Sequence, residues 1–99
     1  MPYYMIGLTH VQDFARFGEY SAGAVKSVAA HGGRYLAAGE VVEVCEGDFQ
    51  PHGGAVIEFD SAEAAKRWYG SPEYAPFRKL RGEIGSTNLV MMRSADPQS

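Results

Sequence analysis

Residues 3–38 read YYMIGLTHVQDFARFGEYSAGAVKSVAAHGGRYLAA, and this stretch contains the pattern that decides the fold. Its first eight residues are rich in aromatic and branched side chains, which is typical of a β-strand. Asp13 follows as a helix N-cap, and apolar residues then recur at spacings of three and four as far as Val28. The glycines of residues 31–33 end the helix, because glycine readily adopts the left-handed C-terminal cap. The stretch therefore predicts a strand–helix–strand unit, with residues 34–38 as the second strand.

The rest of the chain predicts two more strands, a helix in two parts and a final strand. Residues 41–46 (VVEVCE) and 54–59 (GAVIEF) are extended segments separated by a turn rich in Gly, Asp and Pro. A helix capped at residue 60 or 61 comes next. Ser71-Pro72 restarts the helix as its N-cap and first helical residue, and residues 87–93 (TNLVMMR) form the last strand.

The resulting order is β-α-β-β-α-β, the split βαβ arrangement of the ferredoxin-like α+β fold. Its sheet is antiparallel, and both helices lie on one face. Both faces of the first and last strands are apolar. In the first strand Tyr4, Ile6 and Leu8 share one parity and Tyr3 and Met5 the other; in the last, Leu89 and Met91 oppose Val90 and Met92. A sheet face left in water is normally polar at alternate positions. We therefore expect a second copy of the chain to cover it as a two-fold homodimer; the alternative is a monomer with an apolar patch, which monomeric proteins rarely expose.

Length and composition favour one small domain over residues 1–93, with a polar, disordered tail over 94–99. The chain carries 9 basic and 12 acidic residues, a net charge of −3, which disfavours nucleic-acid binding. A lone cysteine, Cys45, gives no internal disulfide. The N-terminal residues do not resemble a signal peptide, and no apolar stretch is long enough to span a membrane. We expect a cytoplasmic protein without a membrane partner.

Several short motifs together resemble an uncharacterised bacterial family, the domain-of-unknown-function family thirteen-thirty. Residues 30–36 resemble its AHGGRYL segment, and residues 46–51 resemble its EGDW-P turn. Residues 57–74 resemble its EF…A..WY.SPEY segment, and Leu80-Arg81 resembles its LR pair. The resemblance covers about residues 2 to 93.

This resemblance implies the dimeric α/β-barrel superfamily, in which two ferredoxin-like chains pack sheet against sheet. Relatives in that superfamily include cofactor-independent monooxygenases, muconolactone isomerase-like enzymes and haem-degrading enzymes. The resemblance supports the fold more than a function, because one fold carries many activities.

Metal and cofactor motifs are absent from the sequence. The spacings of His10, His31 and His52 match no zinc signature, and neither a P-loop nor a Rossmann glycine pattern occurs. We therefore expect no metal and no cofactor.

Two polar residues are the candidates for catalysis. His31 is a candidate general acid or base, because histidine titrates near neutral pH; the alternative is a helix-end side chain that satisfies terminal carbonyls. Arg34 is a candidate oxyanion ligand; the alternative is an ion pair with Glu46 or Glu58 across the sheet. Glu58 itself is an acidic residue in an apolar strand; if it is buried we expect it to have a partner, and the alternative is that it sets the register near the dimer interface.

A set of aromatic residues is the candidate ligand-binding wall between helices and sheet, with Glu58 beside it. The members expected to bind substrate are Tyr20, Tyr35, Trp68, Tyr69 and Tyr74. Tyrosine and tryptophan supply apolar area together with a hydrogen-bonding group. The alternative is that these aromatics form the core of a thin domain.

Two functions remain open from the sequence. The first is a cofactor-independent enzyme, or a binder, of a small organic acid or quinone-like aromatic in a pocket between sheet and helices. The second is a non-catalytic dimeric module with a structural, regulatory or protein-interaction role. Large losses of stability on truncating Trp68 are expected from the second, and impaired ligand binding from the first.

Overall fold

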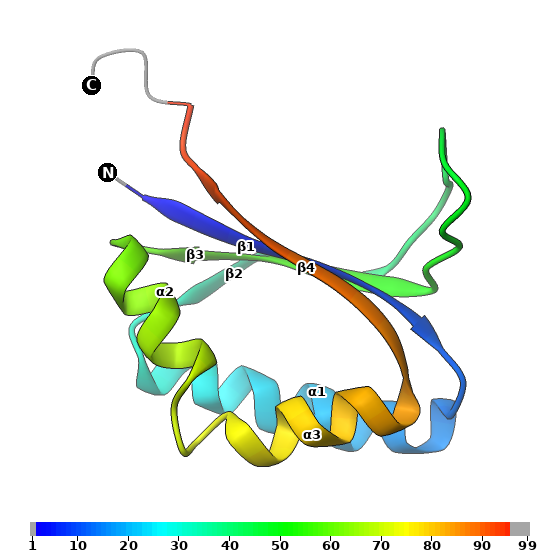
Figure 1. The fold of residues 1–99 in the computed structure, drawn as a ribbon, viewed down its shortest axis with the longest axis horizontal. Helices are drawn as coiled ribbons and strands as arrows, with labels where there is room; N and C mark the ends of the chain where they lie inside the picture. The colour runs from blue at the N-terminus through cyan, green and yellow to red at the C-terminus, as the bar shows by residue number, and fades with distance from the viewer. Residues whose placement is uncertain (1, 96–99) are drawn as a thin grey trace.

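A four-stranded antiparallel sheet is covered on one face by three helices (Figure 1). The computed structural model describes residues 2–95. The elements, in chain order, are β1 (Tyr3–Val11), α1 (Phe14–Ala30), β2 (Arg34–Glu40), β3 (Gly53–Phe59), α2 (Ala62–Tyr69), α3 (Ala75–Ile84) and β4 (Gly85–Arg93). The strand order is β2-β3-β1-β4, and every neighbouring pair is antiparallel. This confirms the predicted ferredoxin-like α+β fold.

Local signals set most helix ends where the sequence predicts them. The Asp13 side chain accepts a hydrogen bond from the backbone N–H of Arg16 and caps α1. Ser61, one of the two predicted caps, accepts from the N–H of Ala64 and starts α2. Gly32 ends α1 with φ of 76°, the left-handed conformation that glycine adopts without strain.

Two predicted elements differ in the structure. Residues 41–46 do not form a strand, because the pairing of β2 with β3 ends where Glu40 faces Gly53. Pro51, just before that point, has no N–H to continue the ladder. The helix predicted from Pro72 begins at Ala75, and the Ser71 hydroxyl instead accepts the N–H of Tyr74 within a turn.

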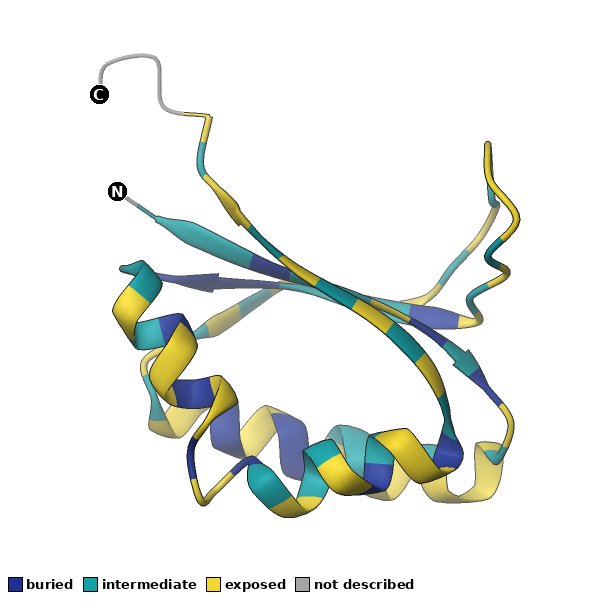
Figure 2. Ribbon diagram, viewed as in Figure 1, coloured by how far each residue is buried: buried dark blue, intermediate teal, exposed yellow. Residues whose placement is uncertain are grey.

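The core lies between the helices and the sheet face that turns towards them (Figure 2). Its largest fully buried side chains are Trp68, Tyr74, Phe59, Ile84 and Val28. Trp68 packs at 4.2 Å from the Tyr74 ring and 5.7 Å from Phe59, measured between ring centroids. The indole N–H donates to the Ser27 hydroxyl at 3.0 Å, so its polar atom is satisfied inside the core.

The opposite face of the sheet carries the apolar residues expected there. Register places Ile6 beside Val90 and Tyr4 beside Met92 on this face. Val90 and Met92 are each more than half exposed, and no element within residues 2–95 packs over them. Residues 41–52 extend from the sheet on this same side, away from the helices (Figure 1).

The predicted tail and the expected lack of a membrane-spanning segment can be compared with the structure only over residues 2–95. Of the predicted tail, residues 96–99 lie outside the described residues. Across residues 2–95, none of the helices has the length and apolarity that crossing a membrane requires.

Candidate functional site

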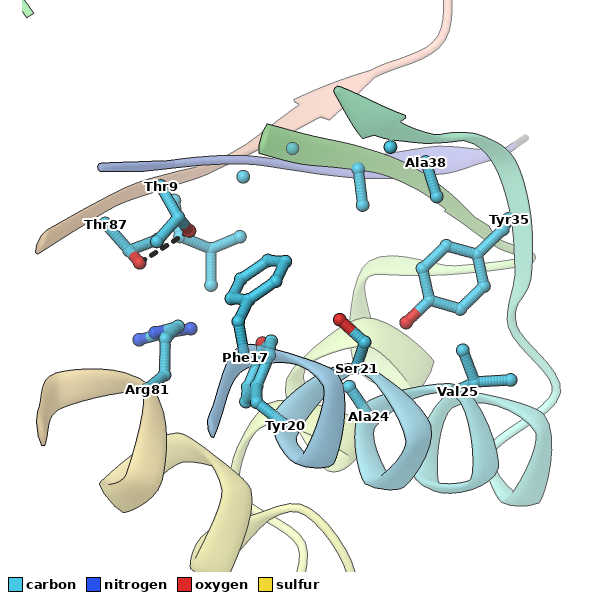
Figure 3. A pocket seen from close by; sticks show the side chains of 15 residues that line it. Thr9, Phe17, Tyr20, Ser21, Ala24, Val25, Tyr35, Ala38, Arg81 and Thr87 are labelled. Atoms are coloured by element: carbon cyan, nitrogen blue, oxygen red, sulfur yellow. Dashed lines mark hydrogen bonds between the residues drawn. The ribbon is translucent and has the colours of Figure 1, made fainter. Parts of the chain in front are cut away.

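A cavity of about 300 Å³ lies between the sheet and the helices α1 and α3 (Figure 3). Much of the sheet side of the cavity is made of small residues, namely Gly7, Ala38, Gly39, Gly54 and Ala55. Ala38 and Ala55 are register partners, and their short side chains leave room for a cavity between the sheet and the helices.

Apolar side chains from α1 and β4 form much of the remaining wall. Phe17 and Val25 project from α1 (Figure 3). Leu89 lines the cavity from β4. The cavity thus offers a mostly apolar chamber with a limited number of polar groups, which is the usual composition of a small-molecule site.

The polar end of the cavity is formed by Arg81, Thr9 and Thr87. Arg81 projects from α3 towards the two threonines, whose hydroxyls are 2.8 Å apart (Figure 3). None of the carboxylates in residues 2–95 lies within ion-pair distance of the Arg81 guanidinium. A partly buried cation facing a cavity without a counter-charge favours an anionic ligand.

A hydrogen-bonded chain connects Arg81 to the cavity through two tyrosines. Arg81 Nη1 donates to the Tyr74 hydroxyl at 2.9 Å, and the hydroxyls of Tyr74 and Tyr20 are 2.7 Å apart. Either tyrosine can be the donor of the bond between them. When Tyr74 donates to Tyr20, the Tyr20 proton is left for a ligand in the cavity.

The tyrosines of the site are neutral donors at ordinary pH. Burial, with the nearby Tyr20 adding to it, raises the pKa of Tyr35 to about 12. Burial also raises the pKa of Tyr74 far above its usual value, again with Tyr20 contributing. Tyr35, which lines the cavity, is therefore a neutral phenol near pH 7 and can donate a hydrogen bond to an anion there.

The predicted substrate-binding aromatics fall in three places. Tyr20 and Tyr35 line the cavity, whereas Tyr74 lies behind Tyr20 and is fully buried. Trp68 belongs to the core, at 2 % exposure, and does not line the cavity. Tyr69 is 39 % exposed and does not line this cavity; the Arg78 guanidinium lies over its ring at 5.1 Å.

His31 is not close to this cavity's wall. Its Nε2 lies 2.8 Å from a carboxylate oxygen of Glu73, at the C-terminal end of α1. The hydrogen bond from His31 lowers the pKa of the Glu73 carboxyl below its usual value. His31 thus lies at the end of α1, beyond the residues that surround the cavity, and its ring contacts Glu73 and not the terminal carbonyls of the helix.

Arg34 and Glu58 lie on the face of the sheet that the helices leave open. They are register partners in β2 and β3, and their side chains form an ion pair. Glu58 is nearly buried while Arg34 is exposed. The cross-strand ion pair expected as the alternative for Arg34 is therefore present, and neither residue contributes to the cavity.

Sequence reasoning missed the residues that make the polar end of the cavity. Thr9 shares a parity with the buried Met5, and Arg81 follows Tyr74 by seven residues on the helix face that contacts the core. A polar residue at a core-facing position of a strand or a helix indicates a polar site inside the domain, so Thr9 and Arg81 could have been identified from the sequence. Ala38 could not be assigned to the cavity from the alternation of residues, because the β-bulge between Tyr35 and Ala37 places Tyr35 and Ala38, which have opposite parity, on one face.

A family model matches residues 2–95, and that family is described as Domain of unknown function (DUF1330). The chain belongs to this family. Family membership brings no established activity with it, so the site must be argued from its own geometry. A comparison with curated proteins gives no significant match.

Solved structures with the same fold include proteins with and without an assigned activity. A protein of unknown function from Rhodopseudomonas palustris is 16% identical, with a TM-score of 0.79 over 97% of this chain and 84% of that one. A dimeric ferredoxin-like protein of unknown function from Jannaschia sp. CCS1 is 10% identical, with a TM-score of 0.78 over 95% and 100%. A variant of SnoaB, a cofactor-independent oxygenase from Streptomyces nogalater, is 12% identical, with a TM-score of 0.74 over 96% and 94%. At these identities the likeness shows the fold alone.

Proposed function

We propose that this family member binds a small organic acid, or a quinone-like aromatic that carries an oxyanion, in the cavity between α1, α3 and the sheet. The observation that carries the proposal is Arg81, a cation at the wall of an apolar cavity with no carboxylate partner in the described chain. The cavity is large enough for a small ligand, at about 300 Å³.

A ligand that fits this cavity has an anionic group at one end and an apolar body. Arg81 and the two threonine hydroxyls receive the anion, and Tyr20 donates a further hydrogen bond to it. A planar ring would lie between Ala38 and Ala55 of the sheet and Phe17 of α1.

The same groups favour a reaction in which an oxyanion develops on the ligand. A guanidinium and neutral phenols stabilise an enolate or phenolate without a cofactor, as donors in an oxyanion hole do. The cavity wall contains neither a histidine nor a carboxylate, so the proton would leave to water or within the ligand itself. SnoaB, a cofactor-independent oxygenase with this fold, supports the plausibility of such chemistry.

A second copy of the chain completes the proposed assembly. It packs on the open sheet face and buries the exposed Val90 and Met92 together with the Arg34–Glu58 ion pair. The dimeric protein from Jannaschia supports this proposal.

The second candidate function is a non-catalytic dimeric module. Trp68 and Tyr74 favour it, because both are core residues. His31 and Arg34 favour it because their side chains contact Glu73 and Glu58 away from the cavity. In that case the cavity would bind no acid with measurable specificity.

The experiment that separates the two is a titration with benzoate and with 2-hydroxy-1,4-naphthoquinone, followed by NMR. For Arg81→Met we expect an affinity about 10- to 100-fold weaker, since a hydrogen bond to a charged group contributes about 1.5–3 kcal/mol. Arg78→Met is the matched control, because Arg78 lies on the same helix but donates to the Tyr69 carbonyl outside the cavity. Equal affinities for the two variants, or no binding to the wild type, would reject the proposed site.

A further inference from the structure

A second cavity, of about 230 Å³, lies next to the first along the same two strands. Its walls are Met5 of β1, Leu89 and Met91 of β4, and Ala65, Lys66 and Tyr69 of α2. Leu89 lines both cavities, so one side chain stands between them.

Register shows that the two cavities follow one row of side chains. Across β1 and β4 the helix-facing pairs are Thr9 with Thr87, Gly7 with Leu89, and Met5 with Met91. Alternate residues of a strand are about 6.6–6.8 Å apart, so the row runs about 13 Å from the threonine pair to the methionine pair. The row is polar at the threonine pair, which Arg81 faces, and apolar at the methionine pair.

The partition between the cavities is thin. A β-carbon built on Gly7 would lie 3.2 Å from Leu89 Cδ1, which shows that the leucine occupies the space left free opposite this glycine. Leu89 is half-buried, and the two cavities become continuous only when its side chain changes rotamer.

We propose that the second cavity is the tail subsite for the proposed ligand, which is an amphipathic monocarboxylic acid whose apolar chain passes Leu89. This inference rests on the proposed function, because the carboxylate is held at Arg81. The methionine side chains suit such a tail, since they are flexible and polarisable and adapt to chains of different shape. Lys66 is exposed at the rim and keeps its ammonium group in water.

The test is a calorimetric titration of the full chain with straight-chain acids of 6, 8 and 10 carbons, kept below micelle-forming concentrations. Affinity is expected to rise about fourfold for each added CH₂, the equivalent of about 0.8 kcal/mol, until the second cavity is full. Met91→Phe fills that cavity and is expected to flatten the rise while leaving benzoate binding within about twofold of wild type. Met92→Phe, one residue along on the opposite sheet face, is the matched control and should keep the rise.

A measurement on the wild type covers the case in which Met91→Phe does not fold. With ¹³C-methyl methionine labels, the 10-carbon acid should shift the signals of Met5 and Met91 and leave Met92 unchanged, whereas benzoate should move none of the three. Unmoved Met5 and Met91 signals, or an affinity independent of chain length, would overturn the tail subsite. Tighter binding of an α,ω-dicarboxylic acid than of the monoacid of equal length would overturn the apolar character assigned to it.

Failure of the tail subsite and failure of the proposed function give different results. If benzoate binds in an Arg81-dependent way but longer acids bind no better, the first cavity is an anion site and the second cavity is not a tail subsite. If neither benzoate nor any alkanoic acid binds, the anion site at Arg81 itself is wrong, and the tail subsite falls with it.

Discussion

Single residues set how closely the helices approach one another. Gly23 is buried where α1 meets α3, and a β-carbon there would lie 2.0 Å from the Phe77 ring. Gly18, one and a half turns earlier on α1, has no heavy atom within 4 Å of such a β-carbon. Both glycines weaken the helix in isolation, but Gly23 alone of these two is required by packing.

Alanine substitutions at Gly18 and Gly23 are expected to change the free energy of unfolding in opposite directions. Gly18→Ala is expected to stabilise the protein by about 0.5–1 kcal/mol, because alanine is the better helix former. Gly23→Ala is expected to destabilise it by about 1–3 kcal/mol, because the methyl group overpacks against Phe77. Urea unfolding of both variants measures the difference, and two effects of the same sign would contradict the described crossing of α1 and α3.

Tyr35 gives a prediction on pH. Its pKa is raised to about 12 in the folded chain, from an ordinary value of 10.0, so folding favours the neutral phenol. The corresponding stability is complete below pH 10 and is lost as pH rises through about 12. The free energy of unfolding should therefore fall over this range, and by less in Tyr35→Phe. An identical fall in both proteins would show that Tyr35 is not buried as described.

At the scale of elements, α2 is held mainly by one side chain. Trp68 is 2 % exposed and contacts Phe59 and Tyr74, whereas the next residue, Tyr69, is 39 % exposed. Trp68→Ala is expected to cost about 3–5 kcal/mol of unfolding free energy, because it leaves a cavity in the core. Tyr69→Ala should cost clearly less in the same denaturation experiment. Comparable losses would mean that α2 packs by another face.

The elements were predictable where the signal is local, and less so where it depends on neighbours. The caps at Asp13 and Ser61 and the turn at Gly32 follow from short patterns, and the structure has them. Residues 41–46 have the composition of a strand, yet a strand needs a partner, and β3 begins too late in the chain to supply one. Strand propensity reports a fit to a sheet surface, not the presence of a sheet.

The candidate site was less predictable than the fold, for a physical reason. Tyr20 and Tyr35 line the cavity, but Arg81, Thr9 and Thr87 meet there only through tertiary packing and strand register. His31 and Arg34 are chemically versatile residues, and the structure pairs them with Glu73 and Glu58 instead. Residue type alone does not show which of several polar side chains faces a cavity.

At the level of the assembly, we expect a second copy of the chain to bury the exposed apolar face of the sheet. Val90 is 53% exposed, lies beside Ile6 in the register and belongs to the apolar face that the proposed two-fold dimer covers. Val90→Asp is expected to weaken the dimer, since it places a charge in an apolar interface. Light scattering coupled to size-exclusion chromatography measures the change, with Ala29→Asp on the exposed side of α1 as control. A wild type that is monomeric, or a Val90→Asp variant that is fully dimeric, would contradict this assembly.

Selection of an organic acid by Arg81, a cation at the cavity wall with no carboxylate partner in residues 2–95, can be measured by native mass spectrometry. The wild type and Arg81→Met are each incubated with the same mixture of organic acids. We expect a dimer for both proteins, with one acid bound per subunit in the wild type and none retained by Arg81→Met. The same adducts on both proteins, or no adduct on the wild type, would contradict this selection by Arg81.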